Sequence, residues 1–238
     1  MGVPMTATRR YRLLCPIARA LDRLGDRWAL LILRDLHAGP ARFSELHAGL
    51  AGIASNLLTS RLEELQADEL VRRIDGDHQI VLYELTPLGR HTAAILYELA
   101  AFGSRLPVDP DPRPPGNHRT LAVTLSVACT RVVDPSLRLD VELRIDGEPY
   151  TMRAADGRVE VRAGSAVAPA VVIETPYEAM VAAADGELSM AELGKRVRVN
   201  ARDPAARAAA LGLLRDAIAR IAADAPGPDA LPPKRGAR

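Results

Sequence analysis

The chain has 238 residues, of which 48% are hydrophobic, and a formal net charge of +1. The hydrophobic content argues against global disorder, and the charge balance means that a nucleic-acid surface must come from the placement of charges rather than their excess. Two cysteines are too few for a disulfide scaffold or a cysteine-rich zinc site. No signal peptide opens the chain and no apolar run reaches the roughly 18–20 residues of a membrane span, so we expect a soluble cytoplasmic protein without a membrane partner.

Two helices are predicted near the start of the chain. Residues 16–24 place a proline in the first turn of the first helix, and residues 27–37 follow Asp26, a candidate N-cap of the second. Trp28, the only tryptophan, lies on the apolar stripe of the second helix and is expected in the core. Residues 1–14 form an arginine-bearing arm that lies either against a phosphate backbone or in solvent.

The stretch from Pro40 to Leu85 indicates a winged helix-turn-helix. A helix, a short break, a second helix and the two strands of a hairpin follow one another over residues 41–50, 51–52, 53–70, 70–74 and 79–85. In the second helix Leu58, Leu62 and Leu65 share one stripe, the spacing of a buried helix face. A helix with an apolar back and a small polar front, held by a preceding helix, suits insertion into a DNA major groove.

Candidate DNA-contacting residues lie on this stretch. The front of the second helix is expected to meet base edges through Ser55, Asn56, Thr59 and Ser60. Contacts to phosphates or to the neighbouring groove are expected from Arg42, Ser44, Arg61, Arg72 or Arg73, and His78 in the wing. An alternative for Arg61 is a structural one, in which it braces Glu45 or Glu64.

A further helix is predicted over residues 86–105, with Thr86 as N-cap and Pro87 in the first position. Its broad apolar face has no partner within a completed winged domain. Pairing with the same helix of a second subunit is the economical explanation, because a two-fold operator needs a two-fold protein. The alternative is that this helix packs on a second domain.

A proline-rich segment then marks a domain boundary. Five prolines fall between Pro107 and Gly116, a composition typical of an extended spacer. We therefore divide the chain into a winged-helix DNA-binding and dimerisation domain, a linker, a second α+β domain and a disordered tail, over residues 1–106, 107–117, 118–225 and 226–238.

The second domain alternates strands and helices. Residues 119–132 are compatible with a helix or a strand. Strands are predicted over 138–146, 148–154, 158–163, 170–174 and 196–200, and helices over 175–184, 190–194 and 203–223. Alternation in the first strand predicts a half-buried antiparallel strand, with Asp140, Glu142 and Arg144 exposed, and the helix after residue 174 is expected to be capped by Thr175.

Short matches to a known family run in order through the first hundred residues: Cys15-Pro16, 21–25, 28–36, Gly39-Pro40, 42–46, Gly52-Ile53, 58–62, Leu65, Leu70-Val71 and 83–89. In these the domain resembles the HxlR-type bacterial winged-helix regulators. The resemblance implies a homodimeric transcription factor that binds a pseudo-palindromic double-stranded DNA operator. The wing departs from the pattern, since Asp75–His78 is short and acidic.

Cys15 matches a cysteine through which some members of that family sense oxidants or electrophiles. Nearby arginines could lower the pKa of its thiol. Cys129 lies in the other domain, which leaves Cys15 without an obvious resolving partner. The alternative is a small buried side chain with no redox role.

The element order of the second domain provides another resemblance. This order resembles the sterol-carrier-protein type of lipid-binding fold. The shared features are a strand-turn-strand run over 137–161, an apolar strand before a helix, Gly186, a strand over 196–199 and a final helix. That fold implies an apolar tunnel between sheet and helices. Candidate lining residues, each of which has plain core packing as its alternative, are Met152, Val161, Val172, Tyr177, Met180, Val181, Met190 and Leu193.

No catalytic motif is found in the sequence. It lacks a glycine-rich phosphate loop and a His-x-x-x-His pair, and its five histidines are scattered, so we expect neither enzymatic activity nor a metal or other cofactor. The fold class expected is α+β, with an N-terminal winged helix-turn-helix domain and a C-terminal sterol-carrier-like domain.

The function expected is that of a transcriptional regulator responsive to an apolar small molecule sensed by the second domain. A competing hypothesis is a carrier of lipids or hydrophobic metabolites in which the winged domain mediates protein contacts. A third is that the second domain only supports dimerisation.

Overall fold

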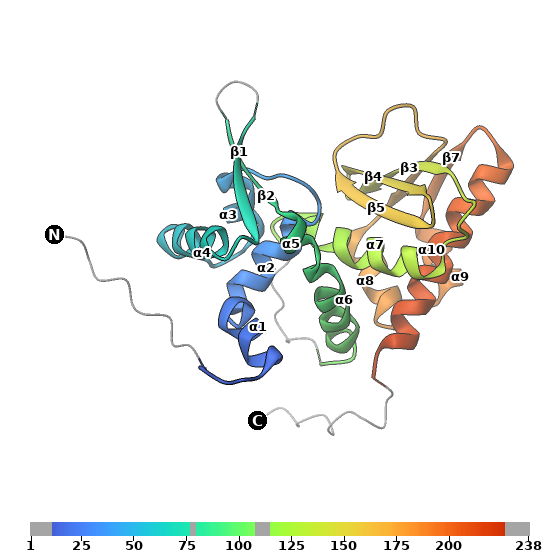
Figure 1. Cartoon of the computed structure of the whole chain (residues 1–238). Helices are drawn as coiled ribbons and strands as arrows, with labels where there is room; N and C mark the ends of the chain where they lie inside the picture. Colours follow the sequence, from blue (N-terminus) through green and yellow to red (C-terminus); the bar gives the residue numbers. More distant parts are fainter. Residues whose placement is uncertain (1–10, 77–79, 108–114, 227–238) are drawn as a thin grey trace.

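A computed structural model describes residues 11–76, 80–107 and 115–226 of the chain (Figure 1). The N-terminal half contains a helical group with a two-stranded wing, and the C-terminal half contains a five-stranded sheet with helices on one side. The molecule is therefore mixed α+β, with a winged helix-turn-helix at its N-terminus. Every helix of the described residues falls short of the length and apolarity that a bilayer crossing requires.

The elements of the N-terminal half agree with those predicted up to the wing. They are α1 Pro16–Leu24, α2 Arg27–Leu36, α3 Phe43–Gly49, α4 Ser55–Ala67, β1 Val71–Asp75 and β2 Val81–Leu85. Asp26 caps α2 as predicted, because its side chain accepts hydrogen bonds from the backbone N–H groups of Trp28 and Ala29. Ala41 pairs with Tyr83 and attaches the start of α3 to the hairpin.

The helix predicted over 86–105 is divided into α5 Pro87–Arg90 and α6 Thr92–Gly103. Thr86 is the N-cap, as predicted, and its hydroxyl accepts a hydrogen bond from the Gly89 N–H at 3.0 Å. Gly89 lies so close to the residue before β1 that a Cβ there would be 2.0 Å from the carbonyl oxygen of Leu70. The Thr92 hydroxyl bonds the Gly89 carbonyl at 2.6 Å and stabilises the interruption between the two helices.

The ambiguous segment 119–132 is helical in the C-terminal half. After the 3-10 turn η2 His118–Thr120, the elements are α7 Leu121–Val132, β3 Leu139–Ile145, β4 Glu148–Ala155, β5 Arg158–Ala163, β6 Val171–Thr175, α8 Tyr177–Ala184, α9 Met190–Arg196, β7 Arg198–Ala201 and α10 Pro204–Asp224. Thr175 was predicted to cap α8, which is wrong: Thr175 is the last residue of β6, and Pro176 is the N-cap.

The strand order of the sheet is β5-β4-β3-β6-β7, so β3 is central. It pairs antiparallel with β4 but parallel with β6, which corrects the expectation of a purely antiparallel strand. Helices α7 and α10 lie against one face of the sheet (Figure 1). On the opposite face Glu142 is buried rather than exposed, because the segment at Ala166 covers it and donates a backbone hydrogen bond to its carboxylate at 3.1 Å.

Helix α6 packs on α7 and α10, which is the second of the two arrangements considered for it. Tyr97 and Ala101 belong to the core of the C-terminal half, and the Tyr97 hydroxyl donates to Asp224 at 2.8 Å. The other side of α6 remains open, with Leu99 and Phe102 48% and 54% exposed. The helix therefore has an intramolecular partner and still presents an apolar surface.

Candidate nucleic-acid interface and apolar cavities

The turn between α3 and α4 sets how α4 is presented. Gly52 has φ +93°, a conformation that favours glycine, and it turns the chain between the two helices. Leu58, Leu62 and Leu65 anchor α4 in the core of the N-terminal half, as their spacing predicted. The opposite side of the first turns of α4 is left facing solvent.

The four residues predicted to meet base edges differ in their exposure and in their hydrogen bonds within the chain. Ser55, Asn56 and Thr59 are exposed on α4. The Asn56 amide oxygen accepts a hydrogen bond from the Leu57 N–H at 2.9 Å, and its NH2 group donates to no other described residue. Ser60 is half-buried and donates to Glu64 at 3.3 Å, so it is the least available of the four.

The residues predicted to meet phosphates also differ in whether they are exposed or already paired. Arg42 is exposed at the start of α3, as is Ser44 within that helix, and Arg73 is exposed on β1. Arg72 forms an ion pair with Glu84 across the hairpin at 2.5 Å. His78 lies outside the described residues.

Arg61 contacts one of the two acidic residues that were considered as its structural partners. It forms ion pairs with Asp26 at 3.2 Å and with Glu64, whereas Glu45 is not its partner. Asp26 caps α2, so Arg61 ties α4 to the N-terminus of α2. In this structure the guanidinium is therefore engaged in contacts within the chain.

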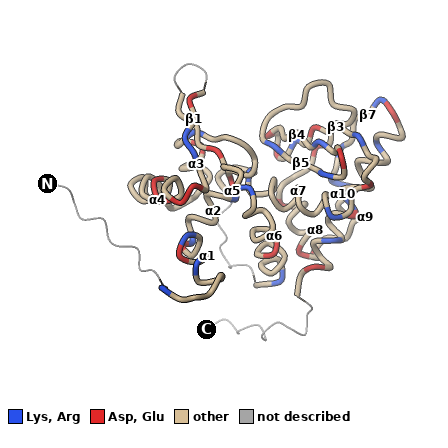
Figure 2. Tube along the Cα trace, in the orientation of Figure 1, with Lys and Arg blue, Asp and Glu red and all other residues tan. Residues whose placement is uncertain are grey.

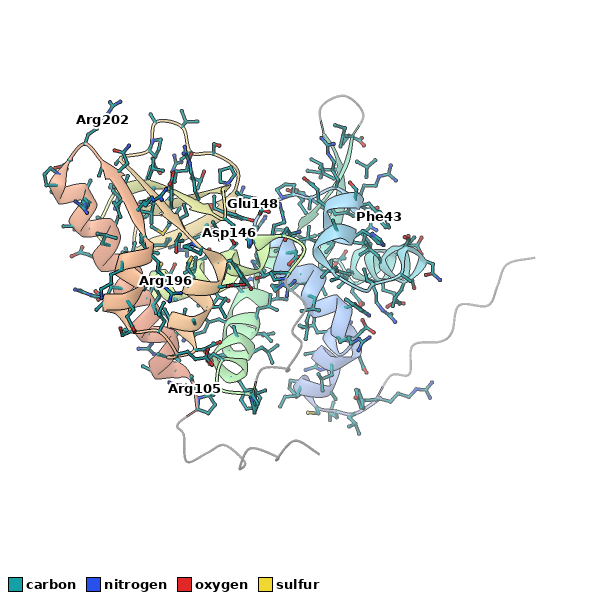
Figure 3. All side chains as sticks on the ribbon, turned by 180° about the vertical axis from the view of Figure 1, so that it is seen from behind. Phe43, Arg105, Asp146, Glu148, Arg196 and Arg202 are labelled. Atoms are coloured by element: carbon teal, nitrogen blue, oxygen red, sulfur yellow. The ribbon has the colours of Figure 1, made fainter. Side chains whose placement is uncertain are left out.

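Two residues of α3 were missed by the sequence reasoning. His47 hydrogen-bonds Ser55 at 3.2 Å between Nε2 and Oγ, and its ring stacks on that of Phe43 at 6.1 Å between centroids. Figure 3 shows Phe43 on the side of the N-terminal half away from the sheet. The four-residue spacing of two aromatic rings on one helix was the signal available in the sequence.

Basic residues alternate with acidic ones along the described part of the chain instead of forming a single patch. In Figure 2 basic and acidic residues are interspersed along the described trace of both halves. DNA contact would therefore depend on individual exposed groups such as Arg42 and Arg73, as the composition indicated.

Arg119, at the start of the C-terminal half, clamps the connection between α2 and α3. Its guanidinium donates to the carbonyl oxygens of Asp35 and Pro40, each at 3.1 Å, and to that of Gly39. The Ala163 N–H at the end of β5 donates to the Ala38 carbonyl at 2.8 Å. The sheet and the helix-turn-helix are thus joined at the C-terminal end of α2.

Ionisable groups surround this junction. Burial raises the pKa of the Asp35 carboxyl, which the neighbouring Arg34 partly opposes. His118 lies 3.3 Å from both Asp146 and Glu148, which Figure 3 shows on the part of the sheet nearer the N-terminal half. The described residues contain no group of three or more His, Cys, Asp or Glu side chains arranged to hold a metal ion.

A cavity of about 460 Å³ lies between the sheet and helices α8 to α10. Three of the predicted lining residues, Met180, Met190 and Leu193, meet there. The sequence reasoning missed the part of the wall that α10 provides through Leu211, Gly212 and Leu214, although an Ala/Leu-rich closing helix was the available signal.

The other predicted lining residues lie elsewhere. Met152 and Val161 are buried in the main core and do not line the cavity. Val172 points to the opposite face of the sheet, because strand β6 directs Val171 and Ile173 inward and the side chain between them outward. Tyr177 packs against His118 at 5.0 Å between ring centroids, and Val181 lines a different, neighbouring groove.

Both cysteines are free thiols, and they differ in burial. Cys15 is half-buried at the N-cap of α1, whereas Cys129 is buried in the C-terminal core, where desolvation raises its pKa to about 12. A buried thiol of such high pKa is a poor nucleophile. Cys129 is therefore unsuited to resolve an oxidised Cys15.

Comparisons with known proteins address the N-terminal half. The profile described as "HxlR-like helix-turn-helix" matches residues 23–108. The HTH-type transcriptional regulator YvaP of Bacillus subtilis, itself described as uncharacterized, is 35% identical over 100 residues, which cover 41% of this chain and 92% of that protein. The HTH-type transcriptional regulator YodB of the same organism is 34% identical over 95 residues, which cover 39% of this chain and 85% of YodB.

Among solved structures, the reduced form of YodB from B. subtilis aligns with a TM-score of 0.35 at 33% identity, covering 40% of this chain and 95% of YodB. The quinone-bound form of YodB aligns with a TM-score of 0.33 at 38% identity, covering 37% of this chain and 94% of that one. Given the match of nearly the whole of YvaP at 35% identity, the chain belongs, through its N-terminal part, to the HxlR-like helix-turn-helix family of transcriptional regulators.

Proposed function

We propose that this protein regulates transcription by inserting α4 into the major groove of a double-stranded operator. The observation that carries the proposal is the polar front of α4, where Ser55, Asn56 and Thr59 are exposed while the leucines behind them are buried. An asparagine amide can pair with both hydrogen-bonding groups of an adenine edge. Arg42, Ser44 and Arg73, which are exposed, would meet phosphates on either side.

We propose that the protein binds a pseudo-palindromic operator as a homodimer. Helix α6, helix α1 and the residues just before α1 expose apolar side chains, including Phe102 at 54%, Ile17 at 70% and Leu14 at 105% exposure. Exposed apolar side chains of this size are typical of subunit contacts where they gather in a patch. A two-fold dimer would place two copies of α4 at successive half-sites.

The C-terminal half is proposed to be a sterol-carrier-like domain that senses an apolar effector. Its cavity of about 460 Å³ falls within the range of small-molecule sites, and its wall is mostly aliphatic. Because Arg119 and Ala163 join the sheet to the end of α2, a ligand that shifts the sheet would also bias the helix-turn-helix. No catalytic role is assigned to the protein.

A selection from randomised duplexes, followed by titration of the enriched sequence, tests this function. We expect salt-sensitive, sequence-selective binding in the submicromolar range. The competing function, a carrier of hydrophobic metabolites, is favoured by the same cavity, and it predicts a bound apolar molecule in native mass spectrometry but no enriched sequence.

A further inference from the structure

A second apolar cavity lies between the two halves. It has a volume of about 610 Å³ and is bounded by α2, α6, α7, α8 and α10. We call it the junction groove. Its apolar wall includes Leu30, Leu31, Leu96, Leu99, Val181 and Ile221.

The junction groove is separated from the inner cavity of the C-terminal half by a thin wall. Met180 and Ile218 line both spaces, and they are only 7% and 5% exposed. The two spaces therefore share side chains without being the same site, and a ligand in either would contact Met180, whose unbranched side chain adapts readily.

The polar groups of the groove are unevenly paired. Arg34 forms an ion pair with Asp35 at 2.8 Å. Arg27 instead lies over the Trp28 ring at 5.1 Å and has no carboxylate within 4.0 Å among the described residues. Asp185 contributes a carboxylate on the α8 side of the groove, and burial and the nearby Glu187 raise its pKa. The α2 side of the groove thus offers a cation beside an aliphatic wall.

We propose that the junction groove binds an apolar monocarboxylate, with the carboxylate at Arg27 and the hydrocarbon against the leucines of α2 and α6. Charge complementarity favours this occupant: a carboxylate would pair with the exposed Arg27 guanidinium, whereas a cation would be repelled by it and an uncharged hydrocarbon would leave it solvated by water. The site is distinct from the inner cavity of the proposed function. Only its effect on DNA binding rests on that function, because α2 packs on the operator-reading helix α4.

Decanoate and 1-decanol are suitable probes, used below their aggregation limits on the full chain. Trp28 is the only tryptophan and touches Arg27, so its fluorescence reports on this end of the groove. Arg27→Gln removes the charge. Gly103→Phe and Gly212→Phe are matched fillers, because Gly103 lines the groove, Gly212 lines the inner cavity, and a Cβ at either would meet no atom within 4 Å.

We expect decanoate to change Trp28 emission saturably and to bind at least fivefold more weakly to Arg27→Gln, while 1-decanol is little affected by that substitution. Gly103→Phe should abolish the decanoate response and Gly212→Phe should preserve it. If a filler variant fails to fold, Arg27→Gln decides alone.

Decanoate binding to Arg27→Gln that equals binding to the parent protein would overturn the proposal, and so would either of two further results. Loss of decanoate binding in Gly212→Phe but not in Gly103→Phe would place the acid in the inner cavity and leave the proposed function intact. Conversion of a dimer to a monomer by Gly103→Phe, with decanoate binding unchanged, would show that a second copy covers the groove. Operator titration of the same variants reports separately on DNA binding.

Discussion

The Arg119 guanidinium donates a hydrogen bond to the backbone carbonyl of Asp35 across 84 positions of sequence, at 3.1 Å between Nε and the oxygen. Both residues are buried, and the same guanidinium also holds the carbonyls of Gly39 and Pro40. A residue of the other half of the chain therefore bonds one carbonyl in the last turn of α2 and two carbonyls of the loop that follows it.

Replacing Arg119 by Met should destabilise the protein by about 2–4 kcal/mol, because buried carbonyl groups lose their donor and the Asp35 carboxyl loses a nearby cation. Urea unfolding measures this change. The matched control is Arg153→Met, which removes an exposed ion pair with Asp140 and should cost less than about 1 kcal/mol. An equal loss of unfolding free energy in the two variants would contradict the stabilising role of Arg119.

Replacing Asn56 by Ala should weaken operator binding by about 1–3 kcal/mol, the value of a bidentate base contact, without changing the free energy of unfolding. A fluorescence-anisotropy titration of the selected duplex measures the affinity. Asn200→Ala, an exposed asparagine on β7, serves as control and should bind normally. An unaltered affinity of Asn56→Ala would remove this residue from the interface.

Replacing Arg61 by Gln should lower stability by about 0.5–1 kcal/mol, because its ion pairs with Asp26 and Glu64 are half-exposed. The slope of log affinity against log salt should stay unchanged, since this guanidinium is not expected at a phosphate. Arg42→Gln is the contrasting variant and should reduce that slope by roughly one. A reduced slope in Arg61→Gln would restore Arg61 to the DNA interface.

The stability of the N-terminal half should fall as the pH is lowered from about 6.5 towards 4. Burial, aided by the charge of Arg90, lowers the pKa of His37 from 6.5 to about 4. The unfolded chain therefore binds a proton in this window that the folded chain does not, so the stability present above pH 6.5 is progressively lost, by roughly 1–3 kcal/mol.

The hydrogen bond of His37 to Thr92 fixes the tautomer of the neutral ring. Thr92 directs its hydroxyl proton to the Gly89 carbonyl, so the ring Nε2 must donate to the Thr92 oxygen, 3.0 Å away. His37→Gln should flatten the pH dependence of the unfolding free energy measured at pH 7 and pH 5. The exposed His91→Gln should leave it as in the parent protein, and an equal flattening in both would contradict the assignment.

Replacing Phe102 by Glu should shift the protein towards a monomer and weaken operator binding, because a charge would be buried in the proposed α1–α6 contact. Sedimentation velocity measures the oligomeric state. Val167→Glu is the matched control, since Val167 is 93% exposed on a loop of the C-terminal half. A dimer that persists in Phe102→Glu would exclude this face as the subunit contact.

Most elements, and several of their ends, could be predicted because they depend on residues close in sequence. Asp26 and Thr86 cap their helices as expected, each through hydrogen bonds to N–H groups two or three residues ahead. The stripe of α4 was also visible, since burial of Leu58, Leu62 and Leu65 follows from helical period alone.

The candidate sites were only partly predictable. In β6 three apolar residues follow one another, so nothing in the sequence marked Val172 as the one facing outward. The burial of Glu142 depends on a loop that crosses the sheet, and the bracing role of Arg61 depends on where α2 lies. Each of these facts is a relationship between segments far apart in the chain.

The sequence by itself determined the local elements, the polar front of α4 and the family to which the N-terminal half belongs. Only the tertiary structure decided that Arg119 holds the end of α2, that α6 packs on α7, and that two cavities share Met180 and Ile218. The physical reason is range: helical period and capping act within about four residues, whereas the register of strands and the packing of helices bring together groups that no local pattern relates.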